Sequence, residues 1–196
     1  MSSYSRQQLE DWLKTINVDT DSVVDIGGSQ LPIKKRVKSW KVNDYKILDL
    51  DNPHECKQEP QIVADINDEF FYEMNAEWEE RFDVAFCLEV SEYWWNPYKA
   101  LENINYILKK EGKLYISFHF IYPVHNPVSE DCLRYTENGA IKLLENAGFK
   151  IENMEYRYEE GDDLNIMKFY QSERMRPSKE YLKHNVVGTL ITAVKK

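Results

Sequence analysis

Acidic residues and glycines follow apolar runs in the first third of the chain, in a pattern suited to binding a nucleotide-like ligand. Asp25 lies in one such run and is followed by Gly27 and Gly28, and Asp49 stands at the end of the next run. Glycines let the backbone turn sharply and approach a ligand closely. An acidic residue roughly 20 residues after such a turn can accept hydrogen bonds from ribose hydroxyls. The spacing therefore predicts a site for a ribose-containing cofactor.

Two later apolar runs are also followed by carboxylates. Asp65 comes after the run at 61–64, and Glu89 comes after the run at 82–88. In an open α/β sheet, ligands bind beyond the carboxyl ends of the strands. An acidic residue after a strand is also a common helix cap, so each signal alone is weak. Their occurrence in order, after successive strands, favours one shared site.

Seven strands and four helices are predicted around these residues. Strands are short apolar or β-branched runs between turn residues, and helices carry apolar residues at helical spacing behind a capping residue. The predicted helices begin with a capping box at Ser5 and Gln8, at Asp68, at Asn96 and at Thr136, and the third is expected to stop near Gly112. The predicted strands span residues 22–26, 46–50, 61–64, 82–88, 113–120, 149–158 and 187–194.

This alternation of strands and helices indicates the fold class. Short apolar strands between amphipathic helices favour a parallel sheet covered on both faces. We expect an α/β, Rossmann-like three-layer sandwich with a mostly parallel seven-stranded sheet, in one domain over residues 1–196. The last two strands have no obvious long helix between them, so one of them can be antiparallel. Residues 159–183 are polar and aromatic without clear periodicity, and we expect them to form a lid over the ligand end of the sheet.

The composition excludes several classes of protein. The chain has 196 residues and a net charge of −9, so it is a poor candidate for binding nucleic acid, which depends on Lys and Arg. The basic run at 34–38 is interpreted as a solvated surface. The three cysteines have neither disulfide nor zinc spacing, and His54 beside Cys56 is not taken as a metal site. With no apolar leader and no membrane span of about 20 apolar residues, a cytoplasmic protein is expected.

At these positions the sequence resembles the class I S-adenosylmethionine (SAM)-dependent methyltransferases, above all small bacterial members of the methyltransferase type 11 kind. The resemblance covers about residues 23–149. Residues 23–29, Val-Val-Asp-Ile-Gly-Gly-Ser, resemble the family's first motif, whose glycine loop cradles the amino-acid part of SAM. The resemblance thus implies that four residues of this motif bind the cofactor: Asp25, Gly27, Gly28 and Ser29.

The resemblance also implies how the rest of SAM is held. Asp49 matches the residue that holds the ribose and is preferred to Asp51, which is placed to begin the next turn. The adenine would be read at Asp65 and Ile66. The motif that ends the fourth strand, with Leu88 and Glu89, would lie beside the sulfonium.

A proline-flanked loop after the fifth strand resembles a pattern from relatives that act on glycans or small metabolites. It contains His125, which we expect to be the base or a substrate-binding group, unless it is bonded to its own loop. Asp131 is the second catalytic candidate, and a structural ion pair with Arg134 is the alternative. Substrate binding is predicted for four residues, with packing as the alternative: Tyr93, Trp94, Arg134 and Tyr135.

The function implied is transfer of a methyl group from SAM to a small acceptor, such as a sugar, a glycan or a small metabolite. Oxygen is favoured over nitrogen as the accepting atom because a candidate base is present. Two departures from the family favour an inactive SAM-binding or scaffold protein: Ser29 stands where glycine is usual, and Tyr93 where many relatives have histidine. A nicotinamide-dependent oxidoreductase is a further alternative, although the full GxGxxG spacing is missing. A nucleic-acid methyltransferase is disfavoured by the acidic charge.

Overall fold

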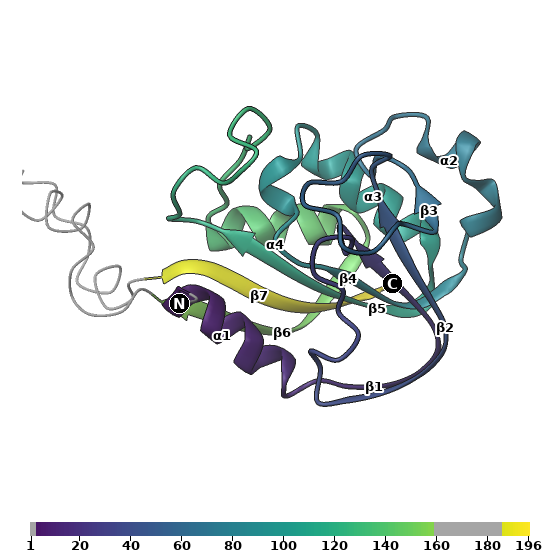
Figure 1. The fold of residues 1–196 in the computed structure, drawn as a ribbon, viewed down its shortest axis with the longest axis horizontal. Helices are drawn as coiled ribbons and strands as arrows, with labels where there is room; N and C mark the ends of the chain where they lie inside the picture. Colours follow the sequence, from purple (N-terminus) through teal and green to yellow (C-terminus); the bar gives the residue numbers. More distant parts are fainter. Residues whose placement is uncertain (1–2, 159–185) are drawn as a thin grey trace, which may run out of the picture.

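A seven-stranded sheet forms the centre of the molecule (Figure 1). The structure is a computed structural model that describes residues 3–158 and 186–196. The strand order is β3-β2-β1-β4-β5-β7-β6, and β7 runs antiparallel to both of its neighbours while the other pairs are parallel. This confirms the predicted Rossmann-like, mostly parallel sheet. The strands are β1 (Asn17–Ile26), β2 (Ser39–Asp49), β3 (Ile62–Val63), β4 (Phe82–Cys87), β5 (Leu108–His119), β6 (Phe149–Tyr158) and β7 (Val186–Lys195).

Helices cover both faces of the sheet. One face carries α1 (Tyr4–Leu13), and the opposite face carries α3 (Pro97–Ile107) and α4 (Glu137–Asn146) (Figure 1). A short helix α2 (Phe71–Met74) and two 3₁₀ turns, η1 (Ala76–Trp78) and η2 (Ser91–Tyr93), lie in the connections on either side of β4. The three layers follow from the strands being buried on both faces, which requires a cover on each side.

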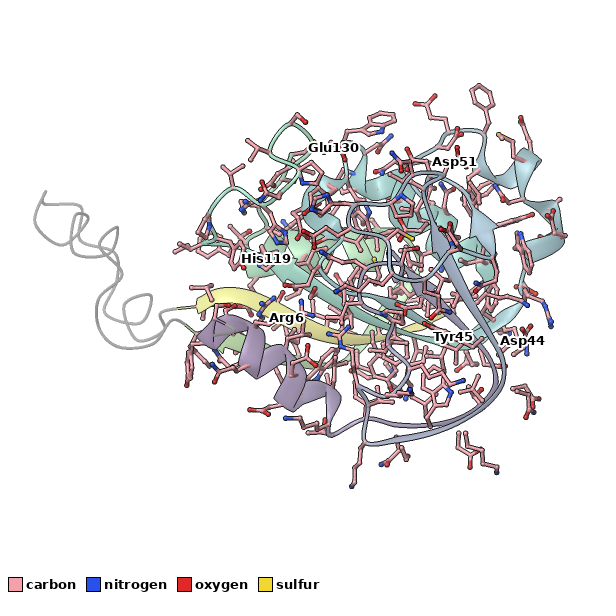
Figure 2. All side chains as sticks on the ribbon, in the orientation of Figure 1. Arg6, Asp44, Tyr45, Asp51, His119 and Glu130 are labelled. Carbon is pink, nitrogen blue, oxygen red and sulfur yellow. The ribbon has the colours of Figure 1, made fainter. Side chains whose placement is uncertain are left out.

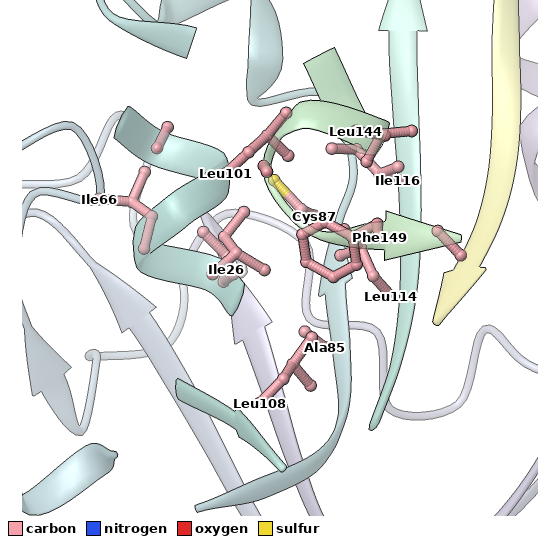
Figure 3. Close-up of a cluster of buried hydrophobic side chains, with 14 of the residues drawn as sticks. Ile26, Ile66, Ala85, Cys87, Leu101, Leu108, Leu114, Ile116, Leu144 and Phe149 are labelled. Atoms are coloured by element: carbon pink, nitrogen blue, oxygen red, sulfur yellow. The ribbon is translucent and has the colours of Figure 1, made fainter. Parts of the chain in front are cut away.

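Two apolar cores lie on opposite faces of the sheet. In β1, Val23 packs toward α1 while its neighbour Val24 packs toward α3, because successive side chains of a strand point to opposite faces. Figure 3 shows the larger core, in which Cys87 and Ile116 of the sheet meet Leu101 of α3 and Leu144 of α4. Burying each such leucine stabilises the fold by about 2 kcal/mol.

Several predicted element boundaries are wrong: β1, β2 and β5 begin earlier than predicted, and three helices differ. The cap of α1 is Ser3, whose hydroxyl accepts a hydrogen bond from the backbone N–H of Arg6, whereas Ser5 lies inside the helix. The third predicted helix ends at Ile107, before the expected stop near Gly112, and the chain enters β5 at once. A Cβ at Gly112 would lie 2.6 Å from a backbone oxygen, so the glycine marks a tight turn within the strand. The helix predicted from 68 to 76 is only Phe71–Met74.

One structural prediction, the lid at 159–183, falls outside the described residues. Within 3–158 and 186–196, no helix has the length and apolar character needed to cross a membrane.

Candidate active site

A cavity of about 960 Å³ opens at the carboxyl ends of the first four strands. Gly27 lines it after β1, Asp49 at the end of β2, Asp65 after β3 and Glu89 after β4. The strand order reverses between β1 and β4, and ligands of open α/β sheets bind at that point. The volume suits a small molecule the size of a cofactor.

Gly27 allows the backbone to form the floor of this cavity. Its φ of 71° lies in the left-handed region, and a Cβ there would fall 2.4 Å from Val90 Cγ2. Its N–H donates to the carbonyl of Leu48 at 2.8 Å, which ties the turn to β2. Only glycine fits both the conformation and the space.

Asp25 supports the glycine loop from behind and does not line the cavity. Its Oδ2 accepts hydrogen bonds from the backbone N–H of Ile33 and from the hydroxyl of Tyr45, both at 2.7 Å. The side chain is buried, and burial raises the pKa of its carboxyl to about 6. Gly28 packs so closely that a Cβ there would lie 2.4 Å from Asp25 Cγ. Asp25 and Gly28 therefore brace the loop from behind, and their direct contact with a cofactor stays a prediction.

Asp49 is held at the cavity by backbone donors. Its Oδ2 accepts the N–H of Ser29 at 3.1 Å and its Oδ1 accepts the N–H of Leu50 at 2.9 Å. Each carboxylate oxygen keeps a lone pair for a further donor. Ser29 itself is buried behind the cavity wall and has no positive φ, so its place in the motif causes no backbone strain. Asp51 is exposed and does not line the cavity, which agrees with the preference for Asp49 (Figure 2).

The far end of the cavity combines an acceptor with apolar walls. Asp65 Oδ1 accepts hydrogen bonds from the backbone and side-chain amides of Asn67, at 2.8 and 3.0 Å. Ile66 and the half-exposed Leu50 add apolar surface beside it. The sequence analysis named Asp65 and Ile66 but missed Leu50, although it directly follows the acidic residue of β2.

A buried cluster of charges lies at the end of β4, and the sequence analysis did not foresee it. Glu89 Oε1 lies 2.7 Å from Arg157 Nη1 and accepts the hydroxyl of Ser117 at 3.0 Å. The other oxygen of Glu89 lies 3.3 Å from Nε2 of His119. Burial alone would raise the pKa of Glu89, but the charges of His119 and Arg157 hold it well below its usual range. Glu89 is therefore a carboxylate whose charge is already matched.

His119 links this cluster to a second buried carboxylate. Its Nε2 lies 3.4 Å from Oε1 of Glu92, a residue with no exposed surface. The ring of Tyr122 stacks on the imidazole at 4.2 Å between centroids. Burial lowers the pKa of His119, but the two carboxylates outweigh it and raise that pKa to about 9. His119 thus carries a positive charge at neutral pH.

His125 stands at the cavity wall with one ring nitrogen engaged. Its Nδ1 lies 3.1 Å from Glu92 Oε1 and 2.9 Å from the hydroxyl of Tyr93. That hydroxyl donates to the carbonyl of Asn126, so it accepts from the imidazole. In this arrangement Nδ1 is the donating nitrogen, and Nε2 is the ring nitrogen left free of these contacts. The side chain is 37% exposed, which leaves it accessible from the cavity.

Comparisons with known proteins show what the chain is similar to. Residues 46–116, from β2 into β5, match the model of the methyltransferase domain family. This segment of the chain resembles a methyltransferase domain. Comparison of the sequence with curated proteins gives no significant match. The similarity to methyltransferases favours SAM over the nicotinamide cofactor of the alternative function.

Solved structures share the fold of this chain. They include a Mesorhizobium loti SAM-dependent methyltransferase (TM-score 0.58, 12% identity, 97% of this chain and 98% of that one). A second is the Burkholderia thailandensis 1,6-didemethyltoxoflavin-N1-methyltransferase with bound 1,6-didemethyltoxoflavin and S-adenosylhomocysteine (TM-score 0.58, 15% identity, 100% of this chain and 80% of that one). A third is the [4+2]-cyclase SpnF (TM-score 0.61, 14% identity, 99% of this chain and 83% of that one). At these identities the likeness establishes the fold alone.

The residues of the cavity fit SAM. The loop at Gly27 leaves no room for a side chain, Asp49 offers two oxygens to a ribose diol, and Asp65 offers an acceptor to an amino group. Leu88 and Glu89 line the same cavity at the end of β4. Within residues 3–158 and 186–196, no group of three or more His, Cys, Asp and Glu side chains is placed to hold a metal ion.

On the acceptor side of the cavity, several predicted site residues lie away from the cavity wall. Asp131 does not touch the imidazole of His125: it accepts the backbone N–H of that residue and pairs with Arg134. Neither Asp131 nor Arg134 lines the cavity, so their pair fixes the loop, which was the alternative reading. Tyr135 is also absent from the cavity wall, since its hydroxyl donates to the buried carbonyl of Ser91.

The aromatic residues after β4 divide between core and cavity. Trp94 borders the cavity, but its side chain has no exposed surface and packs in the larger core. A ligand meets little of a fully buried ring, so a substrate contact of Trp94 stays a prediction. Trp95 is 59% exposed and borders the same cavity, and Tyr93 contacts His125. Tyr93 and Trp95 are thus the better substrate-facing candidates.

Proposed function

We propose that this methyltransferase transfers the methyl group of SAM to an oxygen atom of a small acceptor, with His125 as the general base. The observation that carries the proposal is the contact between Glu92 and His125 Nδ1 at the cavity wall. A buried carboxylate that fixes the tautomer and orientation of a histidine is the usual way to prepare an imidazole as a base. A hydroxyl of a sugar, a glycan or a small metabolite fits this role.

The base has a defined task in the reaction. SAM supplies an electrophilic methyl group on a sulfonium: the acceptor oxygen forms a bond to the methyl carbon as the carbon–sulfur bond breaks, and the electron pair of that bond stays on sulfur. His125 takes the hydroxyl proton at Nε2, while Glu92 stabilises the imidazolium that results. Tyr93 holds the ring in place through Nδ1. Alignment of the acceptor beside the methyl group adds several kcal/mol of rate acceleration.

The two departures from the family do not argue for an inactive protein. Ser29 sits behind the cavity and donates its backbone N–H to Asp49. Tyr93 hydrogen-bonds the candidate base. The Burkholderia relative is named for transfer to a nitrogen and SpnF for a cyclisation, so the shared fold does not select the atom. The oxygen proposal rests on the Glu92–His125 pair.

The experiment that tests the proposal measures S-adenosylhomocysteine released from SAM in the presence of hydroxyl-bearing and amine-bearing acceptors. Hydroxyl acceptors should turn over in the wild type, and His125→Gln should lower that rate by about 100-fold. Binding of S-adenosylhomocysteine to the variant serves as the folding control and should be unchanged. Turnover that favours amines, or that survives His125→Gln, would contradict the proposal.

A further inference from the structure

A second, smaller cavity of about 460 Å³ adjoins the SAM cavity on the side of His125. The two cavities share Arg6, Glu89 and His125, but the smaller one has no contact with Gly27 or Asp49. It is completed by side chains that the larger cavity lacks, namely Ser3, Lys57 and Tyr122. An acceptor whose reactive oxygen lies at His125 would extend into this space.

Two cations face this smaller cavity. Arg6 comes from α1 (Figure 2), with a side chain that is 26% exposed, and Lys57 comes from the connection between β2 and β3. Among the described residues, Lys57 has no side-chain ion pair or hydrogen bond. Glu89 is the single carboxylate in the described part of the wall.

The carboxylates next to Arg6 are already neutralised by other arginines. Glu10 lies 3.1 Å from Arg6 Nε, but Arg36 holds both of its oxygens, at 2.7 and 3.3 Å. Glu89 lies 3.9 Å from Arg6, but Arg157 holds both of its oxygens, at 2.7 and 3.3 Å. The charge of Arg6 is therefore not matched by its neighbours, and the two terminal nitrogens of its guanidinium retain donors.

The positive charge of this cavity stands out in a chain whose net charge is −9. Two unmatched cations that face one cavity attract and orient an anion, because their fields add at the site. Arginine and lysine both bind carboxylate and phosphate oxygens by charge-assisted hydrogen bonds. We propose that the methyl acceptor carries a carboxylate or phosphate group, held by Arg6 and Lys57 while its hydroxyl lies at His125. This inference rests on the proposed function.

The test uses calorimetry on the protein loaded with S-adenosylhomocysteine. The probes are 3-hydroxybenzoate, its neutral analogue 3-hydroxybenzamide, and inorganic phosphate. The wild type should bind the benzoate about tenfold more tightly than the amide. Raising the salt concentration from about 50 to about 500 mM should weaken binding of the benzoate and of phosphate but not of the amide. Equal affinity for acid and amide, or no binding of either, would overturn the proposal.

Variants test whether the two cations bind an anionic group of the acceptor or of the cofactor. Lys57→Gln alters an exposed side chain and should lower benzoate affinity several-fold, and Arg6→Gln should lower it about tenfold. The matched control Lys41→Gln changes an exposed lysine that pairs with Asp19 away from the cavity and should have no effect. Weaker binding of S-adenosylhomocysteine by Lys57→Gln, with benzoate binding unchanged, would overturn the proposal, since the charge would then serve the cofactor.

The two proposals fail in different ways. If the wild type does not bind S-adenosylhomocysteine at all, the proposed methyl transfer fails before any acceptor probe is added. If S-adenosylhomocysteine binds but the protein binds the benzoate no more tightly than the amide, only the inference of an anionic acceptor fails. A preference for the acid that Lys57→Gln removes supports the inference without any measurement of turnover.

Discussion

Oε1 of Glu92 lies 3.1 Å from Nδ1 of His125, although the two residues are 33 positions apart in the chain. The 3₁₀ turn after β4 supplies the carboxylate, and the loop after β5 supplies the imidazole. The backbone carbonyl of Glu92 also accepts hydrogen bonds from Cys132 and Leu133, which ties the loop back to that turn. This arrangement fixes the position of the candidate base relative to the SAM cavity.

Replacing Glu92 should impair the chemical step more than cofactor binding. In Glu92→Gln the imidazole loses the charge that stabilises its protonated form, so kcat should fall by about 100-fold. The affinity for S-adenosylhomocysteine should stay within about twofold. Steady-state kinetics and calorimetry measure the two quantities.

Two further variants serve as controls for the expected loss of kcat in Glu92→Gln. Glu145→Gln removes an exposed carboxylate of α4 and should leave kcat unchanged. The double variant Glu92→Gln, His125→Gln should be little slower than His125→Gln alone, because the carboxylate acts through the imidazole. Additive losses in the double variant would show that Glu92 acts in another way.

His119 should make the stability of the fold depend on pH. Its pKa is raised from 6.5 to about 9 by Glu89 and Glu92. The stabilisation is therefore fully present below pH 6.5 and is lost as the pH rises through 9. The difference in free energy of unfolding between wild type and His119→Gln should shrink by about 3 kcal/mol from pH 6 to above pH 9. Urea denaturation at several pH values measures this difference in free energy of unfolding. A difference that stays constant with pH would contradict the ion pairs of His119 with Glu89 and Glu92.

Asp25 should show a pH dependence of the same sign, at lower pH. Burial raises its pKa from 3.8 to about 6, so folding favours the protonated carboxyl. Its contribution to stability is greatest below pH 3.8 and is lost as the pH rises through 6. The stability of wild type relative to Asp25→Asn should therefore fall by about 3 kcal/mol between pH 3.5 and pH 7.5.

A second substitution at the same position separates bracing from cofactor contact. Asp25→Ala leaves the N–H of Ile33 and the hydroxyl of Tyr45 without their acceptor and should destabilise the fold by about 2 kcal/mol. Asp25→Asn keeps an acceptor oxygen and should bind S-adenosylhomocysteine as the wild type does. A large loss of affinity in Asp25→Asn would instead support the cofactor-binding role that the sequence predicts.

The cofactor half of the site could be predicted from the sequence, because its residues stand at the ends of strands that local periodicity identifies. Gly27, Asp49 and Asp65 each follow an apolar run, and parallel strands bring their carboxyl ends to one edge. The orientation of Asp25 could not be predicted, because a motif position does not reveal which way a side chain points. Only the packing of Tyr45 and Ile33 around it shows that it faces inward.

The charge cluster could not be predicted because its members come from distant parts of the chain. Glu89 meets Arg157 across 68 positions and Ser117 across 28, and no spacing rule covers such contacts. Local ambiguity explains two other errors. Ser3 and Ser5 are both acceptable caps, and the apolar Leu108 continues the helical pattern although the backbone has already entered β5.

The most direct test of the account is calorimetric titration of the protein with S-adenosylhomocysteine, with Asp49→Ala, Asp49→Asn and Asp51→Ala as variants and NAD as a second ligand. We expect micromolar binding to the wild type and to Asp51→Ala, a loss of about 100-fold in Asp49→Ala and a smaller loss in Asp49→Asn, which keeps one acceptor oxygen. NAD should give no heat of binding. Failure of the wild type to bind S-adenosylhomocysteine, or a response to NAD in its place, would contradict the central claim.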